Sequence, residues 1–146
     1  MRIAIGSDHA GVQLKAEIEG LVTQLGHSFE DFGAHDTRSV DYPDVAGAVA
    51  RAVADGQAER GILICGTGIG VSIAANKIKG IRAALCHDTF SARASREHND
   101  ANVLCLGARV IGSGLALDVV RTWLRADFSR EERHARRVAK ITSMEC

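Results

Sequence analysis

The stretch GILICGTGIGVS, residues 61–72, joins a short apolar run to three glycines spaced two residues apart. The run 61–66 is almost continuously apolar, which is typical of a strand buried on both faces of a sheet. The glycines lead from this strand into a helical segment. The order of strand, glycine turn and helix predicts an α/β fold, provided that it repeats along the chain.

The pattern does repeat. Helical periods of apolar residues at intervals of three and four occupy 14–25 and 45–53, and Pro43, the only proline, suits the first turn of the second helix. Segments 113–124 and about 130–141 predict two closing helices. Other apolar runs that predict buried strands are 2–6, 81–86 and 102–107, with 27–33 as a weaker candidate. Because parallel strands need helical crossovers, we expect one doubly wound domain over 1–146, Rossmann-like or flavodoxin-like, with an open parallel five-stranded sheet and helices on both faces.

The composition limits the partners, the cellular location and the cysteine chemistry that we expect. Eighteen basic residues balance eighteen acidic ones, which argues against nucleic acid or an anionic membrane as a partner. The first apolar run is too short for a signal peptide and no stretch approaches a membrane span, so we expect a cytoplasmic protein. The four cysteines contain no C-x-x-C pair, which favours reduced thiols over disulfides or a zinc site.

Ligands of open α/β sheets bind beyond the carboxyl ends of the strands. Polar residues stand at these ends: Asp8 and His9 after the first strand, the loop 66–70 after the third, His87 and Asp88 after the fourth, and Arg109 after the fifth. The free N–H groups of the glycine loop favour a phosphate or a developing oxyanion. A dinucleotide site with Asp88 on the ribose is an alternative, although the spacing is G-x-G-x-G and not G-x-G-x-x-G. A purely structural tight turn is another.

Cys65 lies between the strand and the helix, and helix N-termini lower the pKa of thiols. Such a thiol can take a proton or attack an electrophile, while a buried strand-end cysteine is the alternative. Asp8 and His9 place a carboxylate beside an imidazole, but Asp8 or Ser7 could simply cap the next helix.

Two further groups lie outside these strand ends. His98 and Asn99 stand between a helix and the fifth strand, where His98 could merely complement the helix dipole. Arg133 and Arg137 are four residues apart and share a helical face, which suits a phosphate clamp or an ordinary solvated basic face.

The motifs GSDHAG, VDYPDVA, GILICGTGIGVSIAANKIKGIRA, SREHNDANVLCLGARVIG and RHARRV occur in the chain in this order. In this order and spacing they resemble the sugar-phosphate isomerase family that holds the B-type ribose-5-phosphate isomerases and the galactose-6-phosphate isomerase subunits. The resemblance extends from about residue 2 to residue 141.

The resemblance implies a role for each matching position. Cys65 would be the base that moves a proton between two carbons, because Val71 stands where some members carry a glutamate base. His98 would open the sugar ring, and Thr67 would assist at the ring. The residues implied in substrate binding are Asp8, His9, Gly66, Gly68, Ile69, Gly70 and Asn99, with Arg109, Arg133 and Arg137 at the phosphate.

The implied activity is the interconversion of D-ribose 5-phosphate and D-ribulose 5-phosphate through an enediol, in the non-oxidative pentose phosphate pathway, with neither a metal nor a cofactor. The same chemistry on a six-carbon sugar phosphate such as allose or galactose 6-phosphate is the nearest alternative. A non-catalytic flavodoxin-like module that binds a nucleotide is a more distant one.

His98 ends a helix and precedes a strand, so it should lie at the opposite sheet edge from Cys65 within one chain. If both residues act on one substrate, the site must be shared by two chains. We therefore expect a homodimer, or a tetramer of two such dimers.

Overall fold

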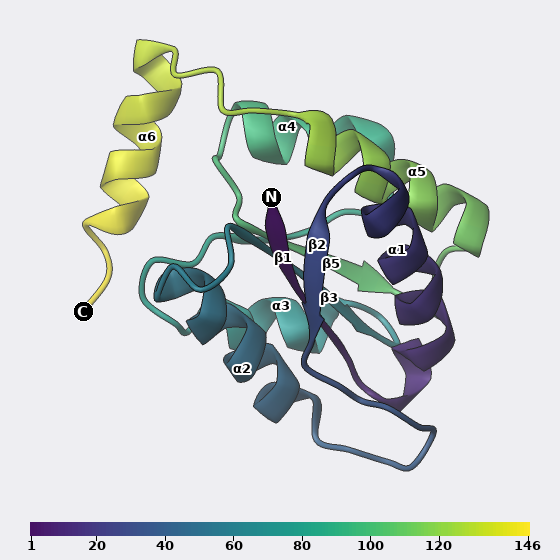
Figure 1. Cartoon of the computed structure of the whole chain (residues 1–146). Coiled ribbons are helices and arrows are strands. Elements are labelled where there is room, and N and C mark those ends of the chain that lie inside the picture. The colour runs from purple at the N-terminus through teal and green to yellow at the C-terminus, as the bar shows by residue number, and fades with distance from the viewer.

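The computed structural model describes residues 1–146 and is built on a parallel five-stranded sheet between two layers of helices (Figure 1). The strands lie in the order β2-β1-β3-β5-β4. Their bounds are Arg2–Ser7 for β1, Ser28–Asp31 for β2, Arg60–Cys65 for β3, Ala83–Leu85 for β4 and Val103–Gly107 for β5. The expected doubly wound α/β fold is confirmed, including the weaker strand candidate that became β2.

The helices also follow the apolar periods. A 3-10 turn, η1, covers His9–Gly11 and leads into α1. Pro43 lies in the first turn of α2, as expected. The bounds are Val12–Gln24 for α1, Tyr42–Ala54 for α2, Ile69–Ala75 for α3, Thr89–Glu97 for α4, Ser113–Arg125 for α5 and Glu132–Thr142 for α6.

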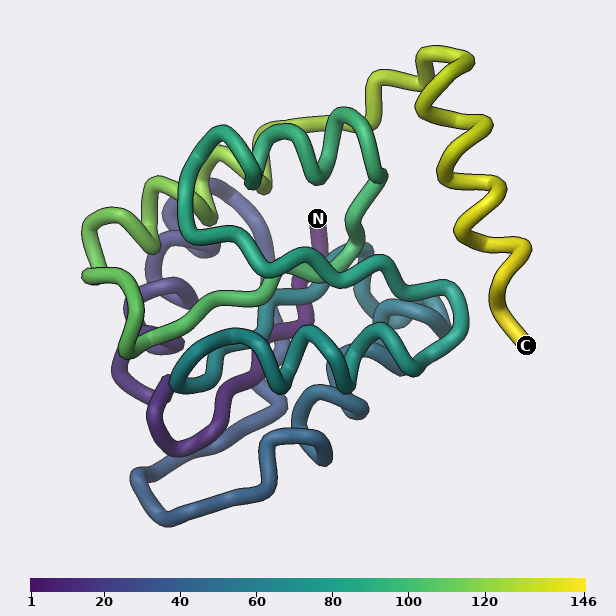
Figure 2. The backbone as a smooth tube through the Cα atoms, turned by 180° about the vertical axis from the view of Figure 1, so that it is seen from behind, coloured from purple at the N-terminus to yellow at the C-terminus, as the bar shows by residue number.

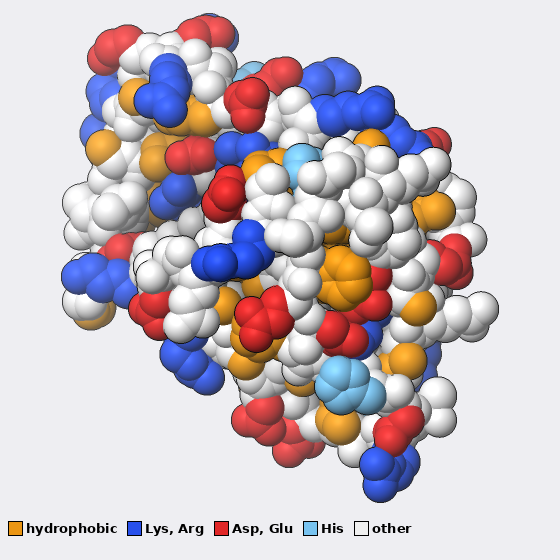
Figure 3. Space-filling view, viewed as in Figure 1, with side chains coloured by type: hydrophobic (Ala, Val, Ile, Leu, Met, Phe, Trp, Pro, Cys, Tyr) orange, Lys and Arg blue, Asp and Glu red, His pale blue; other side chains and the backbone are white.

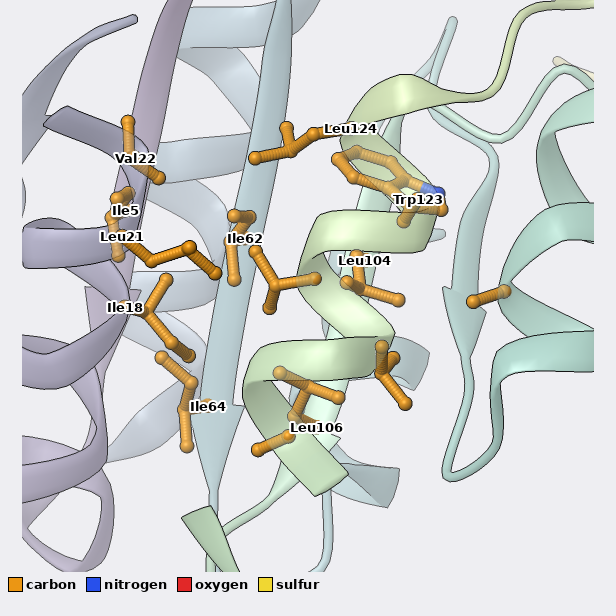
Figure 4. Packing of buried hydrophobic residues seen from close by; sticks show 14 of the residues in the cluster. Ile5, Ile18, Leu21, Val22, Ile62, Ile64, Leu104, Leu106, Trp123 and Leu124 are labelled. Carbon is orange, nitrogen blue, oxygen red and sulfur yellow. The ribbon is translucent and has the colours of Figure 1, made fainter. Parts of the chain in front are cut away.

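The side chains of β3 divide between two cores because successive residues of a strand point to opposite faces. Ile62 and Ile64 pack with α1 and α5 in a core that includes the fully buried Trp123 (Figure 4). Leu63 and Cys65 face the other way, toward α2 and α3. Cys65 is therefore held in the second core, directly beneath the start of α3.

The expectation that 81–86 forms a strand buried on both faces is wrong. Strand β4 is only partly buried, and Leu85 is 37% exposed. The reason is its place in the sheet: β4 is an edge strand that pairs only with β5. A short apolar run cannot by itself distinguish an edge strand from a central one.

Helix α6 stands away from the layered body and is joined to it by the segment after α5 (Figures 1 and 2). Among its residues only His134 is buried. Acidic and basic side chains are interspersed on the face seen in Figure 3, and hydrophobic ones gather where α6 meets the body. None of the helices combines the length and apolar character needed to cross a bilayer.

The sheet has a switch point between β1 and β3. From β1 the chain goes to β2 on one side, and it returns through α2 to β3 on the other side. The two strands end at Ser7 and Cys65, and the Asp8 N–H donates to the Ile64 carbonyl at 3.0 Å. Crevices at such points are where α/β folds bind ligands.

Candidate active site

The Cys65 sulfur is contacted by the glycine loop that follows it. The Gly68 N–H donates to the Cys65 Sγ at 3.1 Å. Gly68 has a φ of 77°, and a Cβ there would come within 2.5 Å of Leu85 Cδ1 and 2.8 Å of the Leu106 carbonyl carbon. Only glycine fits these two requirements. The loop thus aims a backbone donor at the Cys65 sulfur.

The other core cysteines have a different environment. Burial raises the pKa of the Cys86 thiol and of the Cys105 thiol. Both therefore stay protonated, whereas the Cys65 sulfur faces a backbone N–H of the glycine loop.

Asp8 and His9 lie beside this loop at the end of β1. Asp8 is buried, and its Oδ1 accepts the Ala10 N–H at 2.9 Å, so the capping interpretation holds for η1. The His9 Nδ1 accepts the Val40 N–H at 3.3 Å. This bond puts the proton of a neutral His9 on Nε2, where it can be donated to a ligand.

Thr67 and Arg109 complete the same edge. Thr67 is exposed, and its Oγ1 accepts the Ile69 N–H at 3.2 Å. The Arg109 N–H donates to the Gly66 carbonyl at 3.0 Å. A Cβ on Gly66 would lie 3.3 Å from Arg109 Nη1, so the guanidinium covers Gly66.

Two residues of this edge were given no role by the sequence. The Tyr42 ring packs on Gly70, where a Cβ would lie 2.5 Å from the tyrosine Cζ and 2.8 Å from its Oη. The His87 Nε2 accepts the Gly107 N–H at 3.0 Å. The signals were present, since Tyr42 belongs to VDYPDVA and His87 follows the fourth strand, but neither position reveals its contact.

Asp88 has a structural role. It accepts the Ser91 N–H at 2.6 Å and the Ser91 hydroxyl at 2.9 Å, which caps α4. The Ser91 bonds hold the pKa of Asp88 below its usual value. This carboxylate is engaged at the helix start, which weakens the dinucleotide interpretation.

His98 and the arginines of α6 form a second cluster. Helix α4 starts after β4 at the carboxyl edge and ends at Glu97, and His98 caps it before β5 begins at the amino edge. The His98 ring stacks on His134 with centroids 4.3 Å apart and an angle of 11°. The Arg133 Nε donates to the His134 Nε2 at 3.4 Å, and the Arg133 Nη2 pairs with the Glu131 Oε2 at 3.2 Å. Arg137 is exposed.

One chain therefore gathers two groups at separate places. At the carboxyl edge lie Asp8, His9, Cys65, Gly66, Thr67, Gly68, Ile69, Gly70 and Arg109, and away from it lie His98, Asn99, Arg133 and Arg137. A cavity of about 760 Å³ belongs to the second region, where Asn99 lines it with Ile141 and Met144. None of its lining residues comes from the loop 66–70.

The histidine stack predicts a pH dependence of stability. Burial, His98 and the nearby Arg133 and Arg137 lower the pKa of His134 from 6.5. The unfolded chain then binds this proton at a higher pH than the folded protein, so stability falls as the pH drops below about 6.5. Urea unfolding should show that the free energy of unfolding falls more for the wild type than for His134→Phe when the pH is lowered from about 7.5 to about 5.5. The phenylalanine keeps the stack but cannot titrate. Equal losses in the two proteins would contradict this assignment.

The fold and the carboxyl-edge residues define a class: an α/β protein with a thiol and a glycine loop at the switch point of its sheet. Residues 3–141 match the family described as Ribose/Galactose Isomerase, and the chain belongs to this family.

The names of individual relatives agree with the family match. The chain is 49% identical over 144 residues to ribose-5-phosphate isomerase B of Escherichia coli, covering 99% of this chain and 96% of that protein. It is 50% identical over 129 residues to D-erythrulose-4-phosphate isomerase of Pectobacterium atrosepticum, covering 88% and 85%. The solved structure of ribose-5-phosphate isomerase B from Clostridium thermocellum matches with a TM-score of 0.96 at 57% identity, covering 99% and 97%. Family and relatives together support an isomerase that acts on a sugar phosphate.

Proposed function

We propose that the protein interconverts D-ribose 5-phosphate and D-ribulose 5-phosphate, with Cys65 as the base. The observation that carries the proposal is the Gly68 N–H directed at the Cys65 sulfur, on a loop at the switch point of the sheet. The ribose-5-phosphate isomerase B proteins among the relatives support the five-carbon substrate.

The reaction needs a proton to move between neighbouring carbons. The Cys65 thiolate takes the proton from C2 of the open-chain aldose, and the electrons of that C–H bond form the double bond of an enediolate. The same thiol then delivers a proton to C1 while the proton of the C2 hydroxyl passes to the C1 oxygen, which leaves the carbonyl at C2. A single base suffices because both carbons lie within its reach.

The negative charge that develops on the sugar oxygens needs donors. The free amides of the loop 66–70, at the start of α3, can supply them. In the proposed complex the Nε2–H of His9 and the carboxylate of Asp8 bind sugar hydroxyls. In this proposal His98 protonates the ring oxygen as the furanose opens, Asn99 binds the sugar, and the three arginines 109, 133 and 137 bind the phosphate.

Such a site requires two chains, and we propose a homodimer with shared active sites. Cys65 and His98 stand at opposite edges of one sheet, so a second copy must bring its His98 cluster to the Cys65 loop. Arg133 and Arg137 would come with it, because α6 and His98 are joined through the stack on His134.

Exposed apolar side chains support this assembly. Ile69 and Ile73 lie one turn apart on α3 and are 52% and 59% exposed, and Phe90 at the start of α4 is 68% exposed. Helix α6 has eleven residues and one buried side chain, too little packing to hold a helix of that length in water. A partner chain would cover both surfaces.

The test compares kcat/KM for ribose 5-phosphate, allose 6-phosphate and D-erythrulose 4-phosphate, each with and without EDTA. We expect the five-carbon sugar to be preferred by at least about tenfold, since a missing or extra carbon is worth about 1–3 kcal/mol in a fitted pocket. EDTA should not change the rate. A higher kcat/KM for the four- or six-carbon sugar would overturn the substrate assignment and leave the reaction type standing.

A further inference from the structure

The imidazole of His87 lies beside Gly107 of β5, where a longer β4 would place its backbone. Strand β4 ends at Leu85, and its last ladder bond runs from the Cys86 N–H to the Cys105 carbonyl. In a parallel sheet alternate residues of a strand point their backbone groups to the same neighbour. Gly107 therefore points its N–H toward β4, beyond the point where β4 has ended. The His87 Nε2 accepts this N–H at 3.0 Å.

The turn 107–109, which begins at Gly107, is hydrogen-bonded on its opposite side to the end of β3. The Ala108 N–H donates to the Cys65 carbonyl at 2.9 Å, and the Arg109 N–H donates to the Gly66 carbonyl at 3.0 Å. The turn 107–109 is thus held between β3 on one side and His87 on the other.

The glycine loop rests directly on this turn. A Cβ on Gly107 would come within 2.6 Å of the Thr67 carbonyl oxygen, so the two backbones are in close contact. The Arg109 guanidinium in turn covers Gly66. A shift of Gly107 away from β3 would therefore move Arg109 relative to the loop 66–70.

We propose that His87 is a positioning residue that fixes the Arg109 guanidinium over the substrate loop. It acts through the Gly107 amide, not by touching the substrate. The inference rests on the proposed function, in which Arg109 binds the phosphate. It requires a neutral imidazole with its proton on Nδ1, because a protonated ring cannot accept the Gly107 N–H.

Two substitutions separate this role from simple packing. His87→Leu keeps the bulk and removes the acceptor, whereas His87→Gln offers a side-chain oxygen in its place. We expect His87→Leu to raise KM for ribose 5-phosphate by about five- to tenfold with kcat changed less than about twofold, the effect of leaving one buried donor unpaired. His87→Gln should bring KM most of the way back to the wild-type value. His27→Leu, the same change at the amino edge of the sheet, is the matched control and should leave KM unchanged.

A double-mutant cycle with Arg109→Ala tests whether His87 acts through the arginine. The same cycle is repeated with the inhibition constant of inorganic phosphate, a ligand that binds but is not converted. If His87 acts through Arg109, His87→Leu weakens phosphate binding in the wild type and has no further effect in Arg109→Ala. Equal effects of His87→Leu in both backgrounds would overturn the inference, as would an unchanged KM in His87→Leu. If Arg109→Ala itself leaves KM and phosphate inhibition unchanged, the proposed phosphate role of Arg109 fails instead.

Discussion

Replacing Cys65 by alanine is expected to lower kcat for ribose 5-phosphate by about 10²- to 10⁴-fold, the range that a positioned general base contributes. The sulfur is the group toward which the Gly68 N–H is aimed. Alanine cannot take a proton, and the glycine amides alone can only stabilise charge that has already formed. KM should change little because the loop, Asp8 and His9 stay in place.

Two other cysteines provide controls for this result. Cys146 is exposed at the chain end, and Cys86 is buried with a raised pKa. Cys146→Ala and Cys86→Ala should keep kcat within about twofold of the wild type, since Cys65 is the cysteine whose sulfur accepts an N–H of the loop 66–70. A Cys65→Ala protein that is folded and turns over at the wild-type rate would remove the thiol from the mechanism.

Mixing two inactive proteins, Cys65→Ala and His98→Asn, is expected to restore about a quarter of the wild-type activity. Random exchange makes half of the dimers mixed, and each mixed dimer has one site with both residues intact and one with neither. This gain of activity from two inactive proteins follows from the separation of Cys65 and His98 in one chain.

The matched control mixes Cys65→Ala with Cys65→Ser, because no exchange between these chains creates an intact site. Native mass spectrometry reports whether mixed dimers have formed. If they form and the Cys65→Ala and His98→Asn mixture stays inactive, then both residues serve a site within one chain and the shared site is wrong.

Much of the fold was predictable because the signals are local. Continuous apolar runs marked β1, β3 and β5, and periods of three and four marked α1 and α2. The position of Cys65 next to free helix amides also followed from strand, turn and helix in sequence. The strand order, with β5 between β3 and β4, did not. It depends on how crossovers pass over the sheet, and the exposed edge strand β4 was missed for that reason.

The contacts that support the site are non-local, which explains why the sequence did not reveal them. His87 and Gly107 are twenty residues apart, and Tyr42 reaches Gly70 from a different helix. The stack of His98 on His134 joins α4 to α6 across the whole of α5. The sequence placed His87 at the end of the fourth strand, but it revealed neither the contact of His87 with Gly107 nor that of His134 with His98.

The most direct test of the proposed reaction is to follow ribose 5-phosphate with the enzyme in D₂O by proton NMR. Because the proton held on the Cys65 thiol can exchange with solvent before it is delivered, we expect deuterium to appear at C1 of ribulose 5-phosphate, and we expect Cys65→Ala to slow its appearance by about 10²-fold or more. Isomerisation that reaches equilibrium without any deuterium at C1, or equal exchange rates in the two proteins, would contradict the proposed reaction.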